Sequence, residues 1–384
     1  MNEKDDALSE LLDLLSSGLD MPDAVYDQAT SKYTELSRWL SKDHIQRFDT
    51  DASIYPQGSM RLGTIVMPVD ETSGCDVDLV YLRELKKSST TQERLKAQLG
   101  EQLRGYVESL KGSRETIPSL EDGRRCWTLE YPGAFHMDVL PAIPDEDGPA
   151  SDAILIPDRD LRDWQHSNPK GYAAWFEERE AKVLASRLEE VAKAAEVEVE
   201  RIPRERAKTP LRQTVRLLKR HRDLWCQGNH EHKPTSIIIT TLAALAYSSE
   251  ATTASALQAV VGHMEERIER RNGVYWIANP ANPDENFADK WRSEPSRGSR
   301  FFEWLSALQA DVHEATSRTG IHRIVETLST AFGTAVSDGA ARAFGNRYYE
   351  TRTAGDLRMQ AGSGRVGKSG QVRVPPHTNY GESG

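Results

Sequence analysis

The chain has 384 residues, enough for two domains or one large one, and a formal net charge of −10. This acidic balance argues against a protein whose main task is to grip a long nucleic acid, because phosphate neutralisation requires a basic surface. It does not exclude the binding of one or two nucleotides in a cleft loaded with metal ions.

The cysteines and the apolar segments indicate the compartment. Cys75, Cys126 and Cys226 form no CxxC pattern, which fits a reducing cytosol and neither a disulfide framework nor a zinc site. The N-terminus MNEKDDALSE is polar and acidic, unlike a signal peptide. The longest apolar run, residues 236–247, is too short to span a bilayer and predicts a buried helix. We therefore expect a cytoplasmic protein without a membrane partner.

The first half of the chain mixes helical and strand patterns. Apolar residues at helical spacing predict helices over 3–17 and 24–48, and residues 91–111 predict a third. Strand-like runs lie between and after them, in ASIYPQ, DVDLVYL, RCWTLEY and AFHMDVLPAI. The last two flank a Pro-Gly turn and predict a hairpin. A loop rich in Pro, Asp and Gly is expected over 142–170.

From about residue 170 onward the sequence predicts mainly helices. One begins at Thr209-Pro210, a good N-cap followed by proline in the first turn. The other expected helices cover 176–200, 235–248, 254–271, 298–317 and 321–345. The final segment from about 353 is rich in Gly and Ser with few core residues, which predicts disorder.

Acids interrupt two of the strand patterns. Asp76 and Asp78 in DVDLVYL project from one face of a strand, while the residues between and after them face a core. Asp138 is a third such acid, in AFHMDVLPAI. If the two strands are neighbours, three carboxylates converge. Since buried carboxylates require neutralisation, this is the ligand set for phosphoryl or nucleotidyl transfer with two metal ions.

Each acid also has an ordinary interpretation. A lone acid-x-acid pair is usually solvated, and Asp138 could form an ion pair with Arg61 or Arg125. A Gly-Ser turn ahead of the acids favours the metal interpretation. Gly58 lets the backbone approach a ligand, and Ser59 opens a short helix, SMRLGT, that can hold a phosphate. The alternative for this turn is a plain helix N-cap.

The motifs GSMRLGT, DVDLVYL and HMDVLPAI together resemble the polymerase-β-like nucleotidyltransferase superfamily. Within it, the chain resembles the CD-NTases of bacterial CBASS anti-phage systems, relatives of cGAS, of DncV and of oligoadenylate synthase. Four later stretches support this narrower resemblance: SNPKGYAAWF, TPLRQTVRLLKRHRD, KPTSIIITTLAALAY and NPANPDENFADKW. The resemblance covers about residues 50–345.

The resemblance implies an α+β fold. It consists of a polymerase-β-like nucleotidyltransferase core, which is a mixed sheet with helices, plus a C-terminal helical module, as two lobes around a catalytic cleft. We expect N-terminal helices at 1–48, the catalytic core at 49–170, an oligoadenylate-synthase-like helical domain at 171–350 and a disordered tail at 351–384.

The resemblance also implies roles for individual residues. Asp76, Asp78 and Asp138 would be catalytic and hold two Mg²⁺ ions, with Mn²⁺ as an alternative, while an acceptor hydroxyl attacks the α-phosphate and pyrophosphate leaves. The expected nucleotide-binding residues are Gln57, Gly58, Ser59, Lys219, Ser236 and Asn286.

Several of these residues have a second interpretation. Lys219 lies off the apolar face of its helix, where it could reach a phosphate or belong to a solvated basic stripe. Asn282, Asn286 and Trp291 could line an acceptor pocket, or belong to a loop that caps a helix, with the tryptophan in the core. His136 shares the face of Asp138 and is either a core histidine or a neighbour of the site.

The expected function is the joining of nucleoside triphosphates, with ATP and GTP as candidate substrates, into a cyclic di- or trinucleotide second messenger in anti-phage defence. Three alternatives stay open: a template-independent RNA polymerase or tRNA-end transferase, a protein-modifying nucleotidyltransferase of a toxin–antitoxin pair, and an inactive nucleotide-binding scaffold. The C-terminal Gly384 is a candidate for conjugation by ubiquitin-like enzymes, and a homodimer is a candidate assembly. Base identity, linkage and ring size cannot be read from the sequence.

Overall fold

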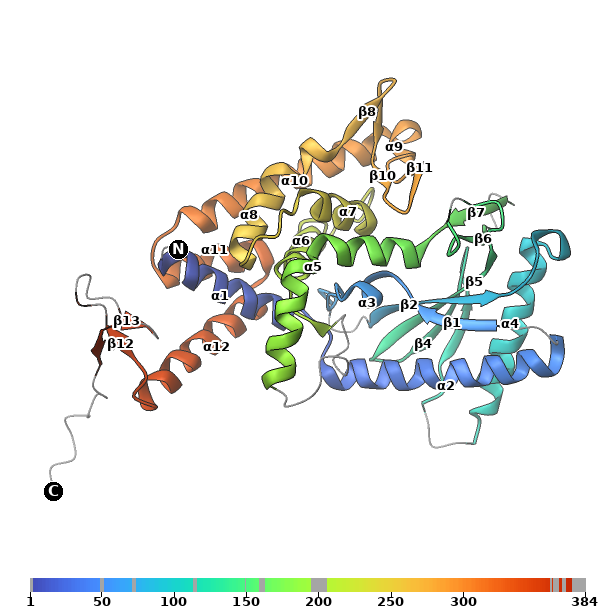
Figure 1. Cartoon of the computed structure of the whole chain (residues 1–384), viewed down its shortest axis with the longest axis horizontal. Coiled ribbons are helices and arrows are strands. Elements are labelled where there is room, and N and C mark those ends of the chain that lie inside the picture. The colour runs from blue at the N-terminus through green and yellow to red at the C-terminus, as the bar shows by residue number, and fades with distance from the viewer. Residues whose placement is uncertain are drawn as a thin grey trace. The chain divides into compact units, whose positions relative to one another are not determined.

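The computed structural model of the chain is shown in Figure 1. It describes residues 3–48, 52–70, 74–112, 116–148, 150–158, 163–194, 206–359, 361, 366–367 and 371–374. The chain forms two compact units, one made of residues 19–314 and one made of the two terminal segments 1–18 and 315–384. In the part of the chain that is described, no helix is both long and apolar enough to cross a membrane.

The larger unit is built on a seven-stranded sheet. Its order is β1-β2-β5-β4-β3, with β6 paired to β5 and β7 paired to β6. Strands β2 and β5 are parallel and the other pairs are antiparallel, which confirms the predicted mixed sheet. The strands are β1 (Ala52–Pro56), β2 (Cys75–Arg83), β3 (Ser119–Asp122), β4 (Trp127–Tyr131), β5 (Phe135–Pro144), β6 (Ile154–Asp158) and β7 (Asp163–Ser167).

One face of this sheet carries the core. In β2 and β5 the side chains of Val77, Leu79, Met137 and Val139 are fully buried in one apolar cluster. Helices α2 (Asp23–Phe48) and α4 (Gln92–Ser109) supply leucines to the same cluster, and α2 runs along the sheet in Figure 1. Because strand residues alternate between faces, the acids of these strands lie on the other face.

The loop expected over 142–170 was a wrong prediction, because it contains β6 and β7. Strand β6, with the sequence ILIPD, is buried along its whole length. Its proline obscured the strand pattern. Only Ile154 and Leu155 pair with β5, so Pro157 lies beyond that pairing and faces β7 alone, where a missing N–H is tolerated.

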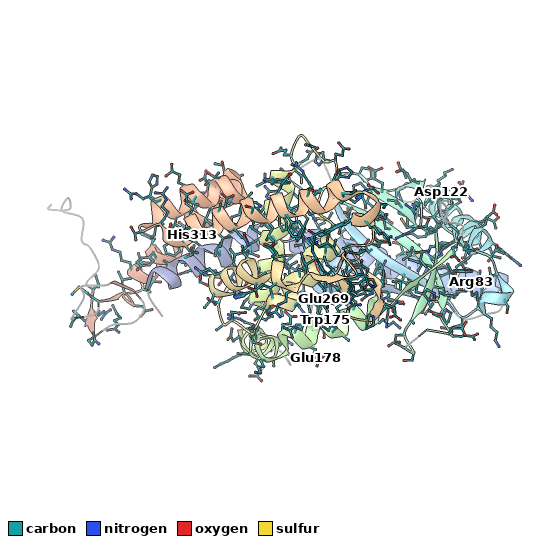
Figure 2. All side chains as sticks on the ribbon, turned by 90° about the horizontal axis from the view of Figure 1, so that it is seen from above. Arg83, Asp122, Trp175, Glu178, Glu269 and His313 are labelled. Carbon is teal, nitrogen blue, oxygen red and sulfur yellow. The ribbon has the colours of Figure 1, made fainter. Side chains whose placement is uncertain are left out.

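The rest of the larger unit is mainly helical. Its central helix α6 (Pro210–Trp225) starts as predicted, because the Thr209 side chain accepts a hydrogen bond from the backbone N–H of Arg212. In Figure 2, Trp175 and Glu178 mark α5, and Arg83 and Asp122 mark the sheet. The helices of this part are α3 (Gly58–Leu62), α5 (Pro169–Ala194), α7 (Ser236–Ala246), α8 (Thr253–His263), α9 (Lys290–Ser293) and α10 (Pro295–Ser317), with 3-10 turns η1 (Lys87–Ser89) and η4 (Glu265–Arg267).

The single helix expected over 254–271 was too long. Helix α8 ends at His263, and residues further on form the hairpin of β8 (Glu269–Arg271) and β9 (Val274–Trp276). Its turn residues Asn272 and Gly273 both have positive φ, as an Asn-Gly hairpin turn requires. A second hairpin, β10 (Ala278–Asn279) with β11 (Asn282–Asn286), follows directly.

A buried ion pair connects α5 to the start of α6. Glu180 and Arg212 are both fully buried, with 2.6 Å between Oε1 and Nη2, and Thr209 also donates to Glu180. Burial raises the pKa of Glu180, and Arg212 opposes this shift.

Glu180→Ala should therefore leave the buried guanidinium of Arg212 without its carboxylate partner and destabilise the protein by about 3–5 kcal/mol. Chemical denaturation followed by circular dichroism measures this loss. The exposed pair Arg187–Glu190 provides the control, because Glu190→Ala should cost less than about 1 kcal/mol. Equal losses of stability for the two variants would contradict a special contribution of the buried Glu180–Arg212 pair.

The smaller unit joins the two ends of the chain. Helix α1 (Glu3–Gly18) packs on α12 (Thr334–Thr353) and α11 (Ile321–Phe332), which also pack on each other. The single helix expected over 321–345 was therefore wrong, because Gly333, with φ of 100°, separates α11 from α12. This grouping differs from the expected division at residue 48, which placed α1 with α2.

The segment expected to be a disordered tail is structured where it is described. Residues 351–353 finish α12, and β12 (Arg358–Met359) pairs with both β13 (Val366–Gly367) and β14 (Val372–Arg373). Gly384, the candidate conjugation site, lies outside the described residues.

Candidate active site

The sheet brings the three predicted acids together. In the parallel pair β2–β5, Asp78 lies directly opposite Asp138, and Asp76 lies opposite His136. Neighbouring strands are about 4.8 Å apart, so residues in register on the same face are in reach of each other. The expected neighbourhood of Asp76, Asp78 and Asp138 is therefore present, with His136 half-buried beside it.

The electrostatics of the acids show how tightly they interact. Burial raises the pKa of Asp78 to about 7, and the charges of Asp138 and Asp76 act in the same direction, while Lys219 opposes them. The pKa of Asp76 is also raised, first by burial and then by Asp138. A site of this kind favours a proton or a cation among the carboxylates.

The donor set fits a magnesium ion. Carboxylate oxygens are the ligands that hard cations prefer, and Mg²⁺ binds through few carboxylates plus water and substrate phosphates. Among the described residues, no three His, Cys, Asp or Glu side chains already surround a metal position.

Asp138 does not form the ion pairs that were considered as its alternative. Arg61 pairs with Glu177, and Arg125 pairs with Asp158, each at 2.7 Å. Instead, Thr128 Oγ1 donates to Asp138 Oδ1 at 2.5 Å from the directly opposite position of β4. This threonine was missed, although the register of the predicted hairpin could have indicated it.

Gly58 lies against one of the acids. Its φ is +58°, and an added Cβ would overlap Asp78 Oδ2 and stand 3.1 Å from Asp78 Cγ. The preceding Gln57 donates its backbone N–H to the carbonyl of Asp78 at 2.8 Å. The turn before α3 is therefore held directly over β2, with half-buried Ser59 following it. Only glycine allows this close approach.

Lys219 is not part of a solvated stripe. It is buried, and its Nζ donates to the carbonyl and hydroxyl oxygens of Thr64 at 3.1 and 3.2 Å. Arg216 donates to the neighbouring Gly63 carbonyl at 2.9 Å. Burial, and next the charge of Arg222, lower the pKa of Lys219 to about 7, while Asp78 raises it. The two side chains therefore fix the end of the Gly-Ser segment through its backbone carbonyl groups.

Ser236 lies in a cationic neighbourhood. As the first residue of α7, it accepts a hydrogen bond from Arg222 Nη1 at 2.8 Å. Lys233, which the sequence reasoning missed, pairs with Asp223 at 2.8 Å, and its charge lowers the pKa of Asp76. The stretch KPTS had already been singled out for its serine, and its lysine was the available signal.

The residues around the second hairpin are mostly structural. The Asn286 side chain bonds to backbone groups of Tyr275, Ile277 and Ala288. Trp291 is buried and packs on aromatic rings, including that of Tyr275, which confirms its interpretation as a core residue. A direct nucleotide contact by Asn286 would compete with these hydrogen bonds.

The raised pKa of Asp78 has a consequence for stability. In the folded, metal-free protein this carboxyl holds its proton up to about pH 7, whereas its ordinary pKa is 3.8. The folded state therefore binds more protons than the unfolded state between those values, and the group makes the protein less stable as pH rises through this window.

Asp78→Asn should therefore raise the melting temperature in EDTA at pH 8, and the gain should shrink towards pH 5. Differential scanning calorimetry of both proteins measures this difference. A melting temperature of Asp78→Asn that lies equally far below that of the native protein at pH 8 and at pH 5 would contradict the raised pKa of Asp78.

Taken together, a mixed sheet with acids on adjacent parallel strands and a glycine turn over them has the features of a polymerase-β-like nucleotidyltransferase site. Residues 7–180 match the family described as "Second Messenger Oligonucleotide or Dinucleotide Synthetase domain". The matched segment contains Asp76, Asp78 and Asp138, so the chain carries a domain similar to the nucleotidyltransferase domains that make oligonucleotide or dinucleotide second messengers. This similarity implies the use of a divalent metal ion.

Individual proteins are similar to most of the chain. The chain is 28% identical over 336 residues to a c-di-GMP synthase of Roseivirga ehrenbergii, covering 85% of this chain and 84% of that protein. The structure of the Bradyrhizobium diazoefficiens CD-NTase CdnG in complex with GTP matches with a TM-score of 0.69 and 21% identity, covering 88% of this chain and 99% of that one. The E. coli CdnC structure with ATP matches with a TM-score of 0.58 and 17% identity over 84% and 96% of the two chains.

Proposed function

We propose that the chain joins two molecules of GTP into a cyclic dinucleotide of guanine, in the cytoplasm, as part of an anti-phage response. The observation that carries the chemistry is the pairing of Asp78 with Asp138 in register, beside Asp76 and beneath Gly58. The choice of GTP is supported by the relative described as a c-di-GMP synthase, which aligns over most of both chains.

In this proposal each residue has a task. Asp76 and Asp78, with Asp138, would hold two ions of Mg²⁺ or Mn²⁺, which when bound would neutralise phosphate charge and lower the pKa of the attacking hydroxyl. Gln57, Gly58 and Ser59 hold the triphosphate close to β2. Thr128 fixes the Asp138 carboxylate through its 2.5 Å hydrogen bond.

The cationic residues flank the same place. Lys233 and Ser236 supply contacts for the outer phosphates. Buried Lys219 stabilises the end of the Gly-Ser segment through its hydrogen bonds to Thr64. A ribose hydroxyl of one nucleotide attacks the α-phosphorus of the other, a phosphodiester bond forms, and the bond to pyrophosphate breaks. Repetition of this step closes the ring and releases a second pyrophosphate.

The competing functions are weaker on specific grounds. An inactive scaffold has no need of three interacting acids whose repulsion makes the metal-free protein less stable. A polymerase of long RNA would need a basic surface, whereas the net charge is −10. Conjugation at Gly384 and a homodimer stay as further expectations for partners.

The base choice is tested with labelled nucleotides. Purified protein is incubated with Mg²⁺ and each of ATP, GTP, CTP and UTP labelled in turn at the α-phosphorus, alone and as a complete mixture. GTP alone should give a compact product with the mass of a cyclic guanine dinucleotide. Equal or greater incorporation of another base from the mixture would contradict the proposed substrate.

A further inference from the structure

The Gly-Ser segment, residues 57–64, is fixed at both of its ends. At its start, Gln57 donates its backbone N–H to the Asp78 carbonyl at 2.8 Å, and Gly58 lies against the Asp78 carboxylate. At its other end, helix α3 stops at Gly63, which has a φ of 65°. Because α3 has only five residues, the contacts of Gly63 also determine how the Gly-Ser turn lies on β2.

Arg216 of α6 connects Gly63 with the linker between α1 and α2, residues 19–22. Its Nη2 donates to the Gly63 carbonyl at 2.9 Å and lies 3.1 Å from Asp20 Oδ2. This guanidinium nitrogen carries two N–H groups, so it can donate to both oxygens at once. The side chains of Arg216 and Asp20 are only 2% and 8% exposed, so solvent screens their attraction little.

The linker itself is fixed by further hydrogen bonds. Asp20 Oδ1 accepts the backbone N–H of Met21 at 3.0 Å, which orients the carboxylate. The Leu19 carbonyl accepts the backbone N–H of Met67 at 2.8 Å. The linker therefore contacts the chain around the Gly-Ser segment twice, once directly at Met67 and once through the guanidinium of α6.

Helix α6 provides a second buried pair for comparison. One turn earlier, the Arg212 guanidinium donates to Glu180 of α5 at 2.8 Å and to the Ala207 carbonyl at 3.4 Å. Both pairs join a buried arginine of α6 to a carboxylate, and both should stabilise the fold. Since Arg216 in addition reaches the Gly63 carbonyl, a comparison of the two pairs separates positioning of the Gly-Ser segment from stability.

We propose that Asp20 is a positioning residue for nucleotidyl transfer, because through Arg216 it sets the place of the Gly63 carbonyl. This rests on the proposed function, in which Gly58 and Ser59 hold the triphosphate. Without the carboxylate the guanidinium can turn towards another acceptor, since its Nε and Nη1 have no hydrogen-bond partner among the described residues. The end of α3 then loses its donor, and the Gly-Ser turn can shift relative to the acids.

The first measurement requires no turnover. Deuterium uptake of peptides covering residues 57–64 is followed by mass spectrometry in the native protein and in two variants, Asp20→Ala and Glu180→Ala. The backbone N–H of Thr64 donates to the Ser59 carbonyl at 2.9 Å and reports on the order of this segment. Asp20→Ala should exchange about tenfold faster, the effect of one hydrogen bond to a charged group. Glu180→Ala should change the rate less than about threefold, because its pair is a separate one.

Steady-state kinetics with GTP and Mg²⁺ provide the second measurement, at a temperature where circular dichroism shows the variants to be folded. Asp20→Ala should lower kcat/KM on the order of 10²-fold, since displacement of a catalytic group by about 1 Å has that effect. Asp20→Asn keeps an oxygen that can accept from Arg216 and loses the charge, so a loss of about tenfold is expected. Glu180→Ala should stay within about threefold of the native value.

The outcomes separate the inference from the proposed function. Equal changes of exchange rate and of kcat/KM in Asp20→Ala and Glu180→Ala would overturn the inference, because a pair that only stabilises the fold behaves in this way. If Asp20→Ala does not fold, native values of both quantities in Asp20→Asn would overturn it. A native protein that forms no product from GTP would overturn the proposed function, and the exchange rates would still decide whether Asp20 fixes the Gly-Ser segment.

Discussion

Asp138→Asn is expected to lower the rate of product formation on the order of 10³-fold or more, since it removes a carboxylate charge that, in the proposed mechanism, the metal ions and the attacking hydroxyl require. The substitution keeps the shape of the side chain and an oxygen that can accept from Thr128. The loss should therefore appear in kcat, while the melting temperature stays at or above that of the native protein, because one of three repelling charges is gone.

Thr128→Val tests the positioning of the Asp138 carboxylate separately from its charge. It removes the hydroxyl that fixes Asp138 and keeps the carboxylate, so we expect a loss of about tenfold, the size of one hydrogen bond. Steady-state kinetics with Mg²⁺ on both variants provide the comparison. Activity of Asp138→Asn within a factor of about ten of the native rate would exclude a catalytic role for this acid.

Gly58→Ala is the second change with a large expected effect. The new Cβ would collide with Asp78 Oδ2, and the residue would have to hold a φ of +58°. We expect activity to fall on the order of 10²-fold, because displacement of a catalytic group by about 1 Å has that effect. Stability should fall by about 1–3 kcal/mol from the strained backbone and the displaced carboxylate.

Gly133→Ala is a matched control for this prediction. Gly133 lies in the β4–β5 turn with a φ of +70°, and an added Cβ there would meet nothing within 4 Å. It carries the same backbone strain without the collision, so it should lose stability and retain activity. Equal losses of activity in both variants would show that the close approach of Gly58 to Asp78 has no special role.

The acids could be predicted from sequence because their signal is local. A carboxylate within an alternating apolar run is conspicuous, and the strand period fixes which acids share a face. That β2 and β5 are neighbours was left as a condition in the sequence analysis, and that they are parallel was not predicted, since periodicity does not specify pairing. Thr128 shows the same limit: it matters only because the hairpin register places it opposite Asp138.

Tertiary contacts explain the remaining differences. Lys219 was considered for its charge as a phosphate contact. In the structure its ammonium group donates hydrogen bonds to Thr64, which is 155 positions away in the chain. Lys233 is relevant because its charge lowers the pKa of Asp76, and the sequence does not show that these two residues are neighbours. The sequence analysis grouped the helices now labelled α1 and α2 in one N-terminal segment, whereas α1 packs on the C-terminal helices α11 and α12.

The central claim is tested most directly by one comparison of products. The native protein and an Asp76→Ala, Asp78→Ala double variant are incubated with all four α-labelled nucleoside triphosphates and Mg²⁺, and the products are treated with phosphatase. We predict a small phosphatase-resistant product with the native protein and none with the variant. A ladder of long phosphatase-sensitive products, or the same resistant product from the double variant, would contradict the account.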